Sequence, residues 1–287
     1  MKNVLLVITF IVHSFLYKSY SINDSVSFIW NAQWIGVTNE PKYHLSKETT
    51  ENFNSAPNQW NCFRKTFMID SLPEMANMRI AIDSKYWLWI NEKLVIYEGG
   101  LKRGPNPNDT YFDLVNIAPY LVEGENIIAI LAWYWGKDGF SHKSSGKAGL
   151  IAELDIPEKH IVTDPSWKSI RHPAYGKTGP PHPNYRMPDE NIHYNAQFDI
   201  GNWTSLSFDD ESWPNSIIFG KPPVYPWNKL IERPIPFWRV EELTKYENDT
   251  ELLGESNGKP IIAYLPRNLT ISPYLKIKAP AGLTIDI

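Results

Sequence analysis

Three adjacent carboxylates, Asp209, Asp210 and Glu211, stand before a tryptophan in the stretch SFDDESWPNS. Acid and base hydrolysis of a glycoside requires two carboxylates on opposite sides of the scissile bond, roughly 5–10 Å apart. Because neighbouring residues on a strand point to opposite faces, Asp209 and Asp210 are poorly placed to act together on one bond. Capping of a turn or strand end is the favoured interpretation, with a structural calcium ion, which prefers oxygen ligands, as the alternative. We predict no catalytic residue here.

A polar, glycine-rich segment, WYWGKDGFSHKSSGKAG, spans residues 133–149. It lacks the spacing of a phosphate-binding loop and that of a nucleophile elbow. A loop tip with many donors and acceptors is suited to a polyhydroxylated ligand. We therefore predict that Lys137, Asp138 and His142 contact carbohydrate, and the alternative is an ordinary solvated loop.

Aromatic residues alternate in the stretch YWLWINEKLV. On a strand Trp87 and Trp89 share one face, whereas Tyr86, Leu88 and Ile90 share the other, and one set enters the core. Trp87 or Trp89 is the candidate platform for a sugar ring, because the apolar face of a sugar packs on indole. Packing in the core or between domains is the alternative for the same two residues.

Metal and thiol chemistry are not indicated. His172, His182 and His193 lack the spacing of a zinc site, so we predict neither a metal nor a cofactor beyond the calcium alternative above. Cys62 is the one cysteine and lies in an apolar run, so a buried, inert thiol is expected and no disulfide can form within the chain.

The composition bounds the class of protein. Hydrophobic residues make up 43% of the 287 residues and aromatic residues 14%, with 12 Trp, which is enough for a sizeable core. The net charge of −4 gives no general attraction to nucleic acid or anionic lipid. Lys2 precedes an apolar run over residues 4–12, with small residues up to Ser21, which indicates a signal peptide. We expect export, to the periplasm or outside the cell, and no membrane span after cleavage.

The elements that must position these residues are strands. Short runs of β-branched and aromatic residues are separated by Gly, Pro, Asn and Asp, the pattern of an all-β protein. Residues 86–97 predict a hairpin with a short polar turn. The expected divisions are a signal peptide at 1–21, a β-sandwich at 22–225, a proline-rich linker at 226–259 and the start of a second, truncated β-domain at 260–287.

Several segments, taken in order, resemble a known family. They are WNAQWI (Trp30 to Ile35), FRKTF (Phe63 to Phe67), WLWINEKLV (Trp87 to Val95), YFDLVNIAPYLVEGENIIAI (Tyr111 to Ile130), TDPSWKS (Thr163 to Ser169), HYNAQFDIGNWTSLSFDDESWPNS (His193 to Ser216), RPIPFW (Arg233 to Trp238) and LPRNLTISPYLKIKAPAGLTIDI (Leu265 to Ile287). The succession resembles the N-terminal, non-catalytic part of a bacterial α-L-rhamnosidase of glycoside hydrolase family 78. The resemblance covers essentially the whole chain after the signal peptide. It departs from the family at Tyr194-Asn195-Ala196-Gln197, where such chains often read Tyr-Asp-Ala-Arg.

The resemblance implies a galactose-binding-like jelly-roll β-sandwich. It also implies that the parent enzyme hydrolyses terminal α-L-rhamnose with inversion, using glutamates on a later (α/α)6 barrel. The sequence contains no run of paired helices, so we expect this chain to lack the (α/α)6 catalytic domain. That domain is its expected partner, and without it we expect the chain to be inactive. The alternatives are a free-standing carbohydrate-binding module and the accessory domain of a β-galactosidase-like glycosidase.

Overall fold

The computed structural model describes residues 29–38, 42–44, 53–100, 104, 106, 108–140, 142–157, 159–176, 191–252, 260–268, 271–272, 274, 276, 278–280 and 282–285. The predicted signal peptide, residues 1–21, lies outside these ranges. Within them β-strands dominate, and the helical pieces are the short turns η1 (Ala118–Tyr120), η2 (Ala196–Phe198) and α1 (Asp249–Leu252). None of the helices in this described part has the length and hydropathy needed to cross a membrane. The chain is therefore an all-β protein, as the sequence predicts.

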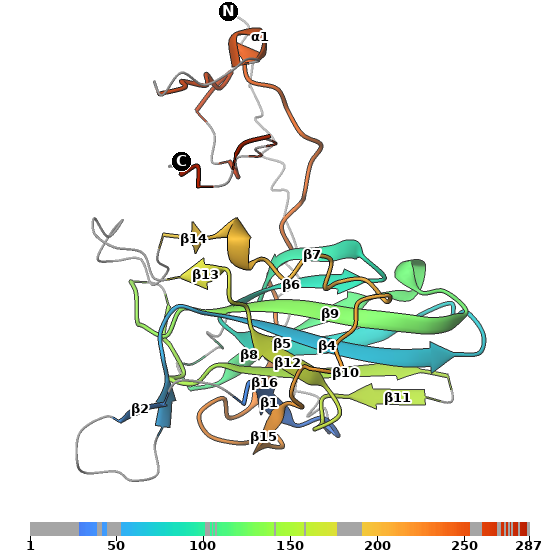
Figure 1. The fold of residues 1–287 in the computed structure, drawn as a ribbon. Helices are drawn as coiled ribbons and strands as arrows, with labels where there is room; N and C mark the ends of the chain where they lie inside the picture. The colour runs from blue at the N-terminus through green and yellow to red at the C-terminus, as the bar shows by residue number, and fades with distance from the viewer. Residues whose placement is uncertain are drawn as a thin grey trace, which may run out of the picture.

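Two sheets packed face to face form the body of the described part of the chain (Figure 1). The larger sheet has seven strands: β15 (Ile217–Gly220), β1 (Trp34–Gly36), β10 (Gly149–Ile156), β5 (Asn77–Asp83), β8 (Thr110–Asn116) and β16 (Leu230–Glu232) in this order, with β11 (Lys159–Val162) paired to β10. The smaller sheet has five strands in the order β12 (Lys168–Arg171), β4 (Gln59–Ile69), β9 (Gly124–Tyr134), β6 (Lys85–Ile90) and β7 (Lys93–Gly99). Two short pairs lie outside these sheets: β2 (Lys42–His44) with β3 (Phe53–Ser55), and β13 (Tyr175–Gly176) with β14 (His193–Tyr194).

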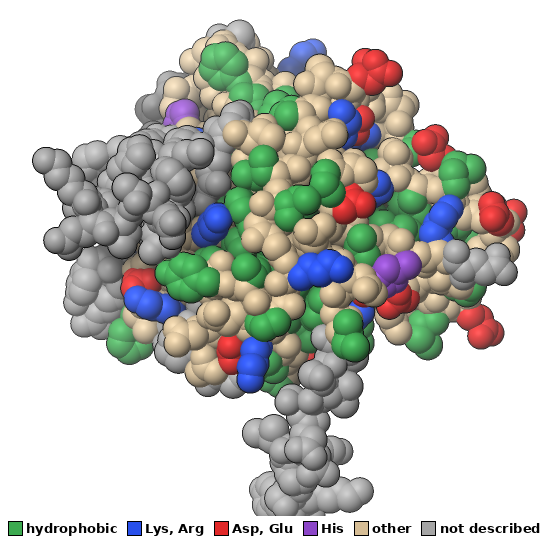
Figure 2. Space-filling model, turned by 90° about the horizontal axis from the view of Figure 1, so that it is seen from below, with side chains coloured by type: hydrophobic (Ala, Val, Ile, Leu, Met, Phe, Trp, Pro, Cys, Tyr) green, Lys and Arg blue, Asp and Glu red, His purple; other side chains and the backbone are tan. Residues whose placement is uncertain are grey.

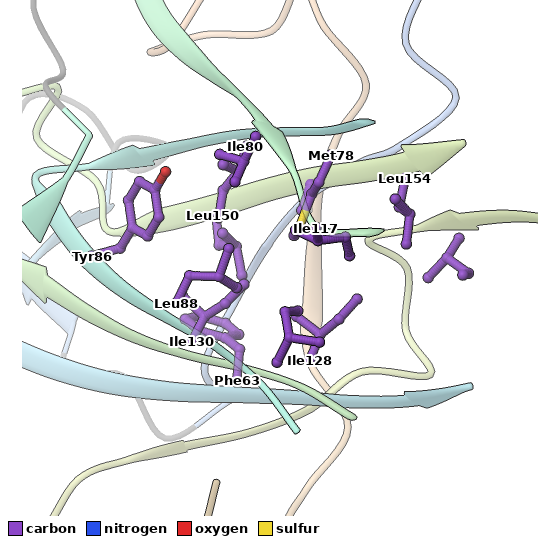
Figure 3. Close-up of a cluster of buried hydrophobic side chains, with 14 of the residues drawn as sticks. Phe63, Met78, Ile80, Tyr86, Leu88, Ile117, Ile128, Ile130, Leu150 and Leu154 are labelled. Atoms are coloured by element: carbon purple, nitrogen blue, oxygen red, sulfur yellow. The ribbon is translucent and has the colours of Figure 1, made fainter. Parts of the chain in front are cut away.

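The main core lies between the two sheets (Figure 3). Phe63, Leu88 and Ile130 come from the smaller sheet and meet Ile80 and Leu150 from the larger one. The side chains of a strand alternate between its faces, so every second residue of these strands enters this layer. Burial of this alternating set is the main stabilising term of the sandwich.

The hairpin β6–β7 shows how the local sequence fixes the register. Asn91 and Glu92 form its turn with φ values of 49° and 67°, the left-handed conformation of a two-residue hairpin turn. The Asn91 side chain donates from Nδ2 to Asn126 Oδ1 at 2.8 Å and accepts from the amide of Ile127 at 3.0 Å. The predicted hairpin is confirmed, and the turn is bonded to the neighbouring strand β9.

The smaller sheet also carries a packed outer face. Strand β9 is buried on both sides, because Ile128 and Ile130 enter the main core while Leu131 and Trp133 enter a second cluster outside the sheet. This outer cluster, called here the tryptophan layer, consists of Trp60, Cys62, Ala129, Leu131, Trp133, Trp135, Trp203 and Trp213. The dense tryptophan content is thus used largely for packing.

The sandwich continues beyond residue 225. Strand β16 pairs in parallel with β8, and Trp227 is fully buried and stacks on Trp34 with ring centroids 4.2 Å apart. Within the segment expected as a linker, 226–259, Trp227 therefore packs against the larger sheet and residues 230–232 are part of it. The backbone amide of Arg233 extends this attachment by donating to Phe112 O at 2.9 Å.

The described residues after Arg233 have a different character. Several large apolar side chains are exposed here, namely those of Trp238, Val240, Leu243, Ile261, Ile262 and Tyr264. No strand is formed in the described parts of 233–285. The amide of Glu247 donates to Tyr264 O at 2.9 Å, which joins the two described pieces of this region. The start of a second β-domain at 260–287 stays a prediction.

The face of the molecule on the side of β1, β15 and β11 has mixed chemistry. Figure 2 shows green, blue and red side chains interspersed over it rather than gathered by type. This pattern is typical of a solvated surface. The candidate binding residues lie instead on the loops at the strand ends and on the outer face of the smaller sheet.

Candidate functional site

The three adjacent acids, Asp209, Asp210 and Glu211, lie in a turn over the tryptophan layer. Asp210 Oδ2 accepts a hydrogen bond from Arg64 Nε at 2.7 Å, and the Arg64 side chain is almost completely buried. Asp209 Oδ1 accepts from the amide of Glu211 at 2.9 Å, which closes the turn. Asp209 thus fixes the backbone of the turn, and Asp210 neutralises the buried Arg64. These contacts do not form a pair of carboxylates on opposite sides of one substrate bond.

Arg64 is the centre of this arrangement. Its Nη1 donates to Trp203 O and, at 3.1 Å, to Ser205 O, while Nη2 donates to Phe208 O at 3.3 Å. One guanidinium therefore satisfies three carbonyls of the loop that covers the tryptophan layer. Its five donors in a planar fork make arginine suited to such a role.

A cluster of two acids and a histidine, residue types that can bind a metal ion, lies on β10 and β11. Glu153, Asp155 and His160 place ligand-type atoms within 4.8 Å of one another. Glu153 Oε1 already pairs with Arg79 at 2.7 Å, and its Oε2 accepts from the amide of Asn31 at 3.0 Å. A cation beside Arg79 would be repelled, so this group serves to attach the N-terminal segment to the sheet.

The polar loop between β9 and β10 surrounds a shallow hollow of about 340 Å³ at one end of the sandwich. The hollow is lined by Gly136, Lys137, Asp138, Ser144, Ser145, Gly146 and Tyr225. Two of the predicted contact residues, Lys137 and Asp138, are therefore brought together here. Tyr225, which is 71% exposed, lines the same hollow.

Asp138 is the charged group of the hollow. Partial burial acts to raise the pKa of Asp138, but hydrogen bonds from Lys143 and from the Ser144 amide, the latter at 2.9 Å, outweigh this effect and lower it. The carboxylate is therefore ionised at neutral pH and remains about half exposed. An ionised, partly exposed carboxylate is a strong acceptor for hydroxyl groups.

His142, the third predicted residue of the loop, is buried against the ring of Trp135, with centroids 4.7 Å apart. Beside it, the buried carboxylate of Asp83 accepts from Ser145 N at 2.8 Å and from Ser145 Oγ at 2.5 Å. His142 Nε2 lies 3.8 Å from Asp83 Oδ1. This position makes His142 part of the support of the loop.

Trp87 and Trp89 lie elsewhere, on the outer face of β6. The two sets face opposite sides, as predicted, and the structure shows that Tyr86, Leu88 and Ile90 are the buried set, while both tryptophans are half-buried against the tryptophan layer. Trp87 stacks on Trp60 at 5.5 Å and Trp89 meets Trp203 edge-on at 5.8 Å. The described lining of the hollow includes neither of them.

The exposed aromatic ring of the hollow was missed by the sequence analysis. Tyr225 stands in the proline-rich stretch KPPVYPW, which predicts a connector rather than a contact. The signal that could have identified it is Trp227 two residues later, because a buried tryptophan fixes the chain against the sheet. Sequence spacing alone does not place residue 225 beside residue 138.

Comparisons with known proteins agree with this fold. No protein-family model and no curated protein sequence matches the chain. A GH78 family rhamnosidase of Bacillus sp. GL1 is similar in structure, with a TM-score of 0.60 and 27% identity over 73% of this chain and 20% of that one. The α-L-rhamnosidase of Dictyoglumus thermophilum shares the fold at 21% identity and a TM-score of 0.52 over 71% of this chain, and that of Aspergillus terreus at 18% and 0.51 over 70%.

This chain spans about a fifth of the length of these solved structures, since it covers 20–22% of each. The resemblance to part of the GH78 rhamnosidases is therefore confirmed, and it concerns a limited region of them. The all-β sandwich expected from that resemblance is confirmed as well.

Proposed function

We propose that this chain is an accessory, carbohydrate-binding β-sandwich of an exported α-L-rhamnosidase-like glycoside hydrolase. The similarity to part of a GH78 rhamnosidase supports the assignment to this kind of enzyme. In this proposal the parent enzyme removes terminal α-L-rhamnose with inversion, and a separate (α/α)6 catalytic domain supplies the acid and the base. The sandwich itself contributes contact with the glycan.

The observation that carries the binding role is the hollow beside Tyr225. Its lining combines one exposed aromatic ring with an ionised carboxylate, Asp138, and a lysine, Lys137, on a loop with small residues. A sugar ring presents an apolar C–H face and a rim of hydroxyl groups, which fit an aromatic face and a few fixed polar groups respectively.

The loop is also held in place, which favours binding by limiting the loss of conformational entropy. Asp83 fixes its second half through Ser145, and Ser84 Oγ accepts from the amide of Trp135 at 3.3 Å at its beginning. Both anchors are buried, and they come from the end of β5 and the residue after it.

The binding role is tested by glycan-array binding of the purified chain, followed by titration with the sugars retained. Tyr225→Ala and Asp138→Asn are each expected to weaken binding about ten-fold or more, because one removes the ring and the other the charged acceptor. Tyr264→Ala is the matched control, since Tyr264 is also an exposed tyrosine but lies outside the hollow. Equal binding by all four proteins would refute the proposed site.

The separation from catalysis is tested with an aryl α-L-rhamnoside. The chain is expected to release no aglycone above a boiled control, because the proposed acid and base belong to another domain. Release above that control would show that this chain is itself hydrolytic. Export is tested independently by expressing the chain with its first 21 residues and determining the N-terminus of the exported product, which is expected to be Ile22.

A further inference from the structure

A second group of polar and aromatic side chains lies on the outer side of the smaller sheet, beside the strand pair β13–β14 (Figure 1), where Tyr175 stacks on Trp60. The group consists of His172, Tyr175, Tyr194 and Asp199. We infer that these four side chains form a second carbohydrate-binding site, separate from the hollow beside Tyr225. The inference rests on the proposed function for the class of ligand, and on its own residues for the site.

His172 supplies a directed donor. Its backbone amide donates to Trp60 O at 2.8 Å, and its ring Nδ1 accepts from the amide of Ala174 at 3.2 Å. Burial lowers the pKa of His172, although the nearby Asp199 carboxylate opposes this effect, so the ring is neutral at pH 7. A neutral imidazole that accepts at Nδ1 carries its hydrogen on Nε2. The His172 ring is only 4% exposed, and its Nε2 lies 3.8 Å from Asp199 Oδ1, beyond hydrogen-bond distance. Among the described residues this donor therefore has no hydrogen-bond acceptor, and in the proposed site a ligand oxygen would approach it beside Asp199.

Asp199 supplies the acceptor, and a short turn holds it in place. The amide of Asn195 donates to Ala174 O at 2.8 Å, and the Asn195 side chain accepts from Gln197 N at 3.0 Å, which begins η2. Asp199 follows this turn and accepts from the amide of Gly201 at 3.3 Å. Its side chain remains 43% exposed, so the carboxylate can still accept from hydroxyl groups of a ligand.

Two tyrosine rings supply the apolar surface and further donors. Tyr175 stacks on Trp60 with centroids 4.0 Å apart, and Tyr194 stands at an angle to Tyr175, 5.0 Å away. Tyr194 is 44% exposed. Burial raises the pKa of Tyr175 to about 12, and burial together with the hydrogen bond to Asp199 raises that of Tyr194 further. Both hydroxyls therefore keep their protons at neutral pH.

The combination selects a class of ligand. A carboxylate, an imidazole N–H and two phenol groups around a partly exposed ring match a neutral, polyhydroxylated ring. The carboxylate would repel a phosphate or another anionic group. A neutral sugar residue is therefore the ligand that this site fits.

The second site lies beside the strand end that leads into the loop of the hollow. The amide of Asn58 donates to Trp135 O at 3.1 Å, and Asn58 Nδ2 donates to Gly176 O at 3.5 Å. Asn58 thus joins the end of β9 to β13.

The test is a titration of the full chain with methyl α-L-rhamnopyranoside and with methyl glycosides of other neutral sugars, followed by backbone amide NMR signals. Ala174 and Gly201 report on the second site because they bond His172 and Asp199, and Ser144 reports on the hollow because it bonds Asp138. We expect both sets of signals to shift with at least one probe. Asp199→Asn is expected to weaken the response at Ala174 about ten-fold or more and to leave the Ser144 titration unchanged.

Further variants separate the two sites and control for folding. Tyr225→Ala is expected to have the opposite effect, with Ser144 unresponsive and Ala174 unchanged. Tyr194→Phe keeps the ring and removes only the hydroxyl, so a weakening at Ala174 with an unchanged unfolding midpoint supports the site directly. A response at Ser144 without one at Ala174 or Gly201 overturns this inference and leaves the proposed function intact. No response of either set to any probe overturns both.

Discussion

At the scale of single residues, Arg64 shows how one buried charge organises a loop. Its guanidinium is held by the Asp210 carboxylate and by carbonyls of Trp203, Ser205 and Phe208. A buried charge is tolerated only when it is paired and fully hydrogen-bonded. Asp210 is therefore explained by the need of Arg64 for a partner, and Asp209 by the turn that it closes.

Removing this partner should destabilise the protein. Asp210→Asn leaves the Arg64 charge without its counter-ion, and because Asp210 is only 23% exposed we expect a loss of about 2 kcal/mol in the free energy of unfolding. Arg64→Ala should cost more, since three carbonyls then lose their donor. Urea unfolding measures both. Glu211→Gln is the matched control, because Glu211 is exposed and its change should lie within about 0.5 kcal/mol of the wild type.

Gly149 shows a second residue-scale constraint, set by close packing. A Cβ atom at this position would lie 2.4 Å from Cζ2 of Trp227, whose ring is fully buried. Gly149→Ala should therefore destabilise the chain by about 1–3 kcal/mol through overpacking, as measured by urea unfolding. In a Trp227→Leu background the same substitution should cost clearly less, because the obstructing ring is gone. Equal costs in both backgrounds would show that the ring is not the cause.

The residues of the candidate site were predicted unevenly. The alternation that separates Trp87 and Trp89 from Tyr86, Leu88 and Ile90 follows from strand geometry, and the structure confirms it. Lys137 and Asp138 were identified because a polar loop between two apolar runs can be recognised from the local sequence alone. Tyr225 was not, because its position beside Asp138 depends on long-range packing of Trp227 in the larger sheet.

At the scale of elements, the boundary of the sandwich was the part that sequence pattern placed least well. Prolines at 222, 223, 226, 234 and 236 predict an extended connector, and β16 has only three residues between them. β16 pairs with β8 in parallel, so the two strands are not joined by a hairpin turn that could be recognised in the sequence. By contrast, the antiparallel hairpin β6–β7 was predictable because its two strands and its turn are adjacent in sequence.

Truncation tests the contribution of this element. A chain ending at residue 225 lacks Trp227 and β16 and exposes the ring of Trp34 and the edge of β8. We expect it to unfold without cooperativity or to aggregate. A chain ending at residue 246 keeps these contacts and the ion pair between Arg233 and Asp113, at 2.5 Å, and should unfold as the full chain does. Thermal unfolding followed by near-UV circular dichroism, which reports tryptophan packing, distinguishes the two. Cooperative unfolding of the shorter chain would place the end of the sandwich before β16.

At the scale of the whole molecule, the packed outer face of the smaller sheet gives the fold a pH dependence. On this face burial raises the pKa of the Cys62 thiol well above 9.0 and that of Tyr175 from 10.0 to about 12, and in the main core burial raises the pKa of Tyr86 as well. In each case the folded chain holds its proton more tightly than the unfolded chain. The unfolded state therefore releases protons first, and the contribution of these groups to stability, complete below about pH 9, is lost as the pH rises through the folded pKa values. His172 acts in the opposite window, because its pKa is lowered by burial and its contribution is lost as the pH falls below about 6.5.

A single substitution isolates one part of this dependence. Tyr175→Phe removes the titrating hydroxyl and keeps a ring that can stack on Trp60. Between pH 10 and 12 we expect the free energy of unfolding to fall more steeply for the wild type than for Tyr175→Phe. The wild type should lose up to about 2 kcal/mol more than the variant over this range. Urea unfolding at a series of pH values measures it, and Tyr264→Phe, at an exposed tyrosine, should follow the wild type. Parallel curves for the wild type and Tyr175→Phe would mean that the Tyr175 hydroxyl reaches water in the folded chain.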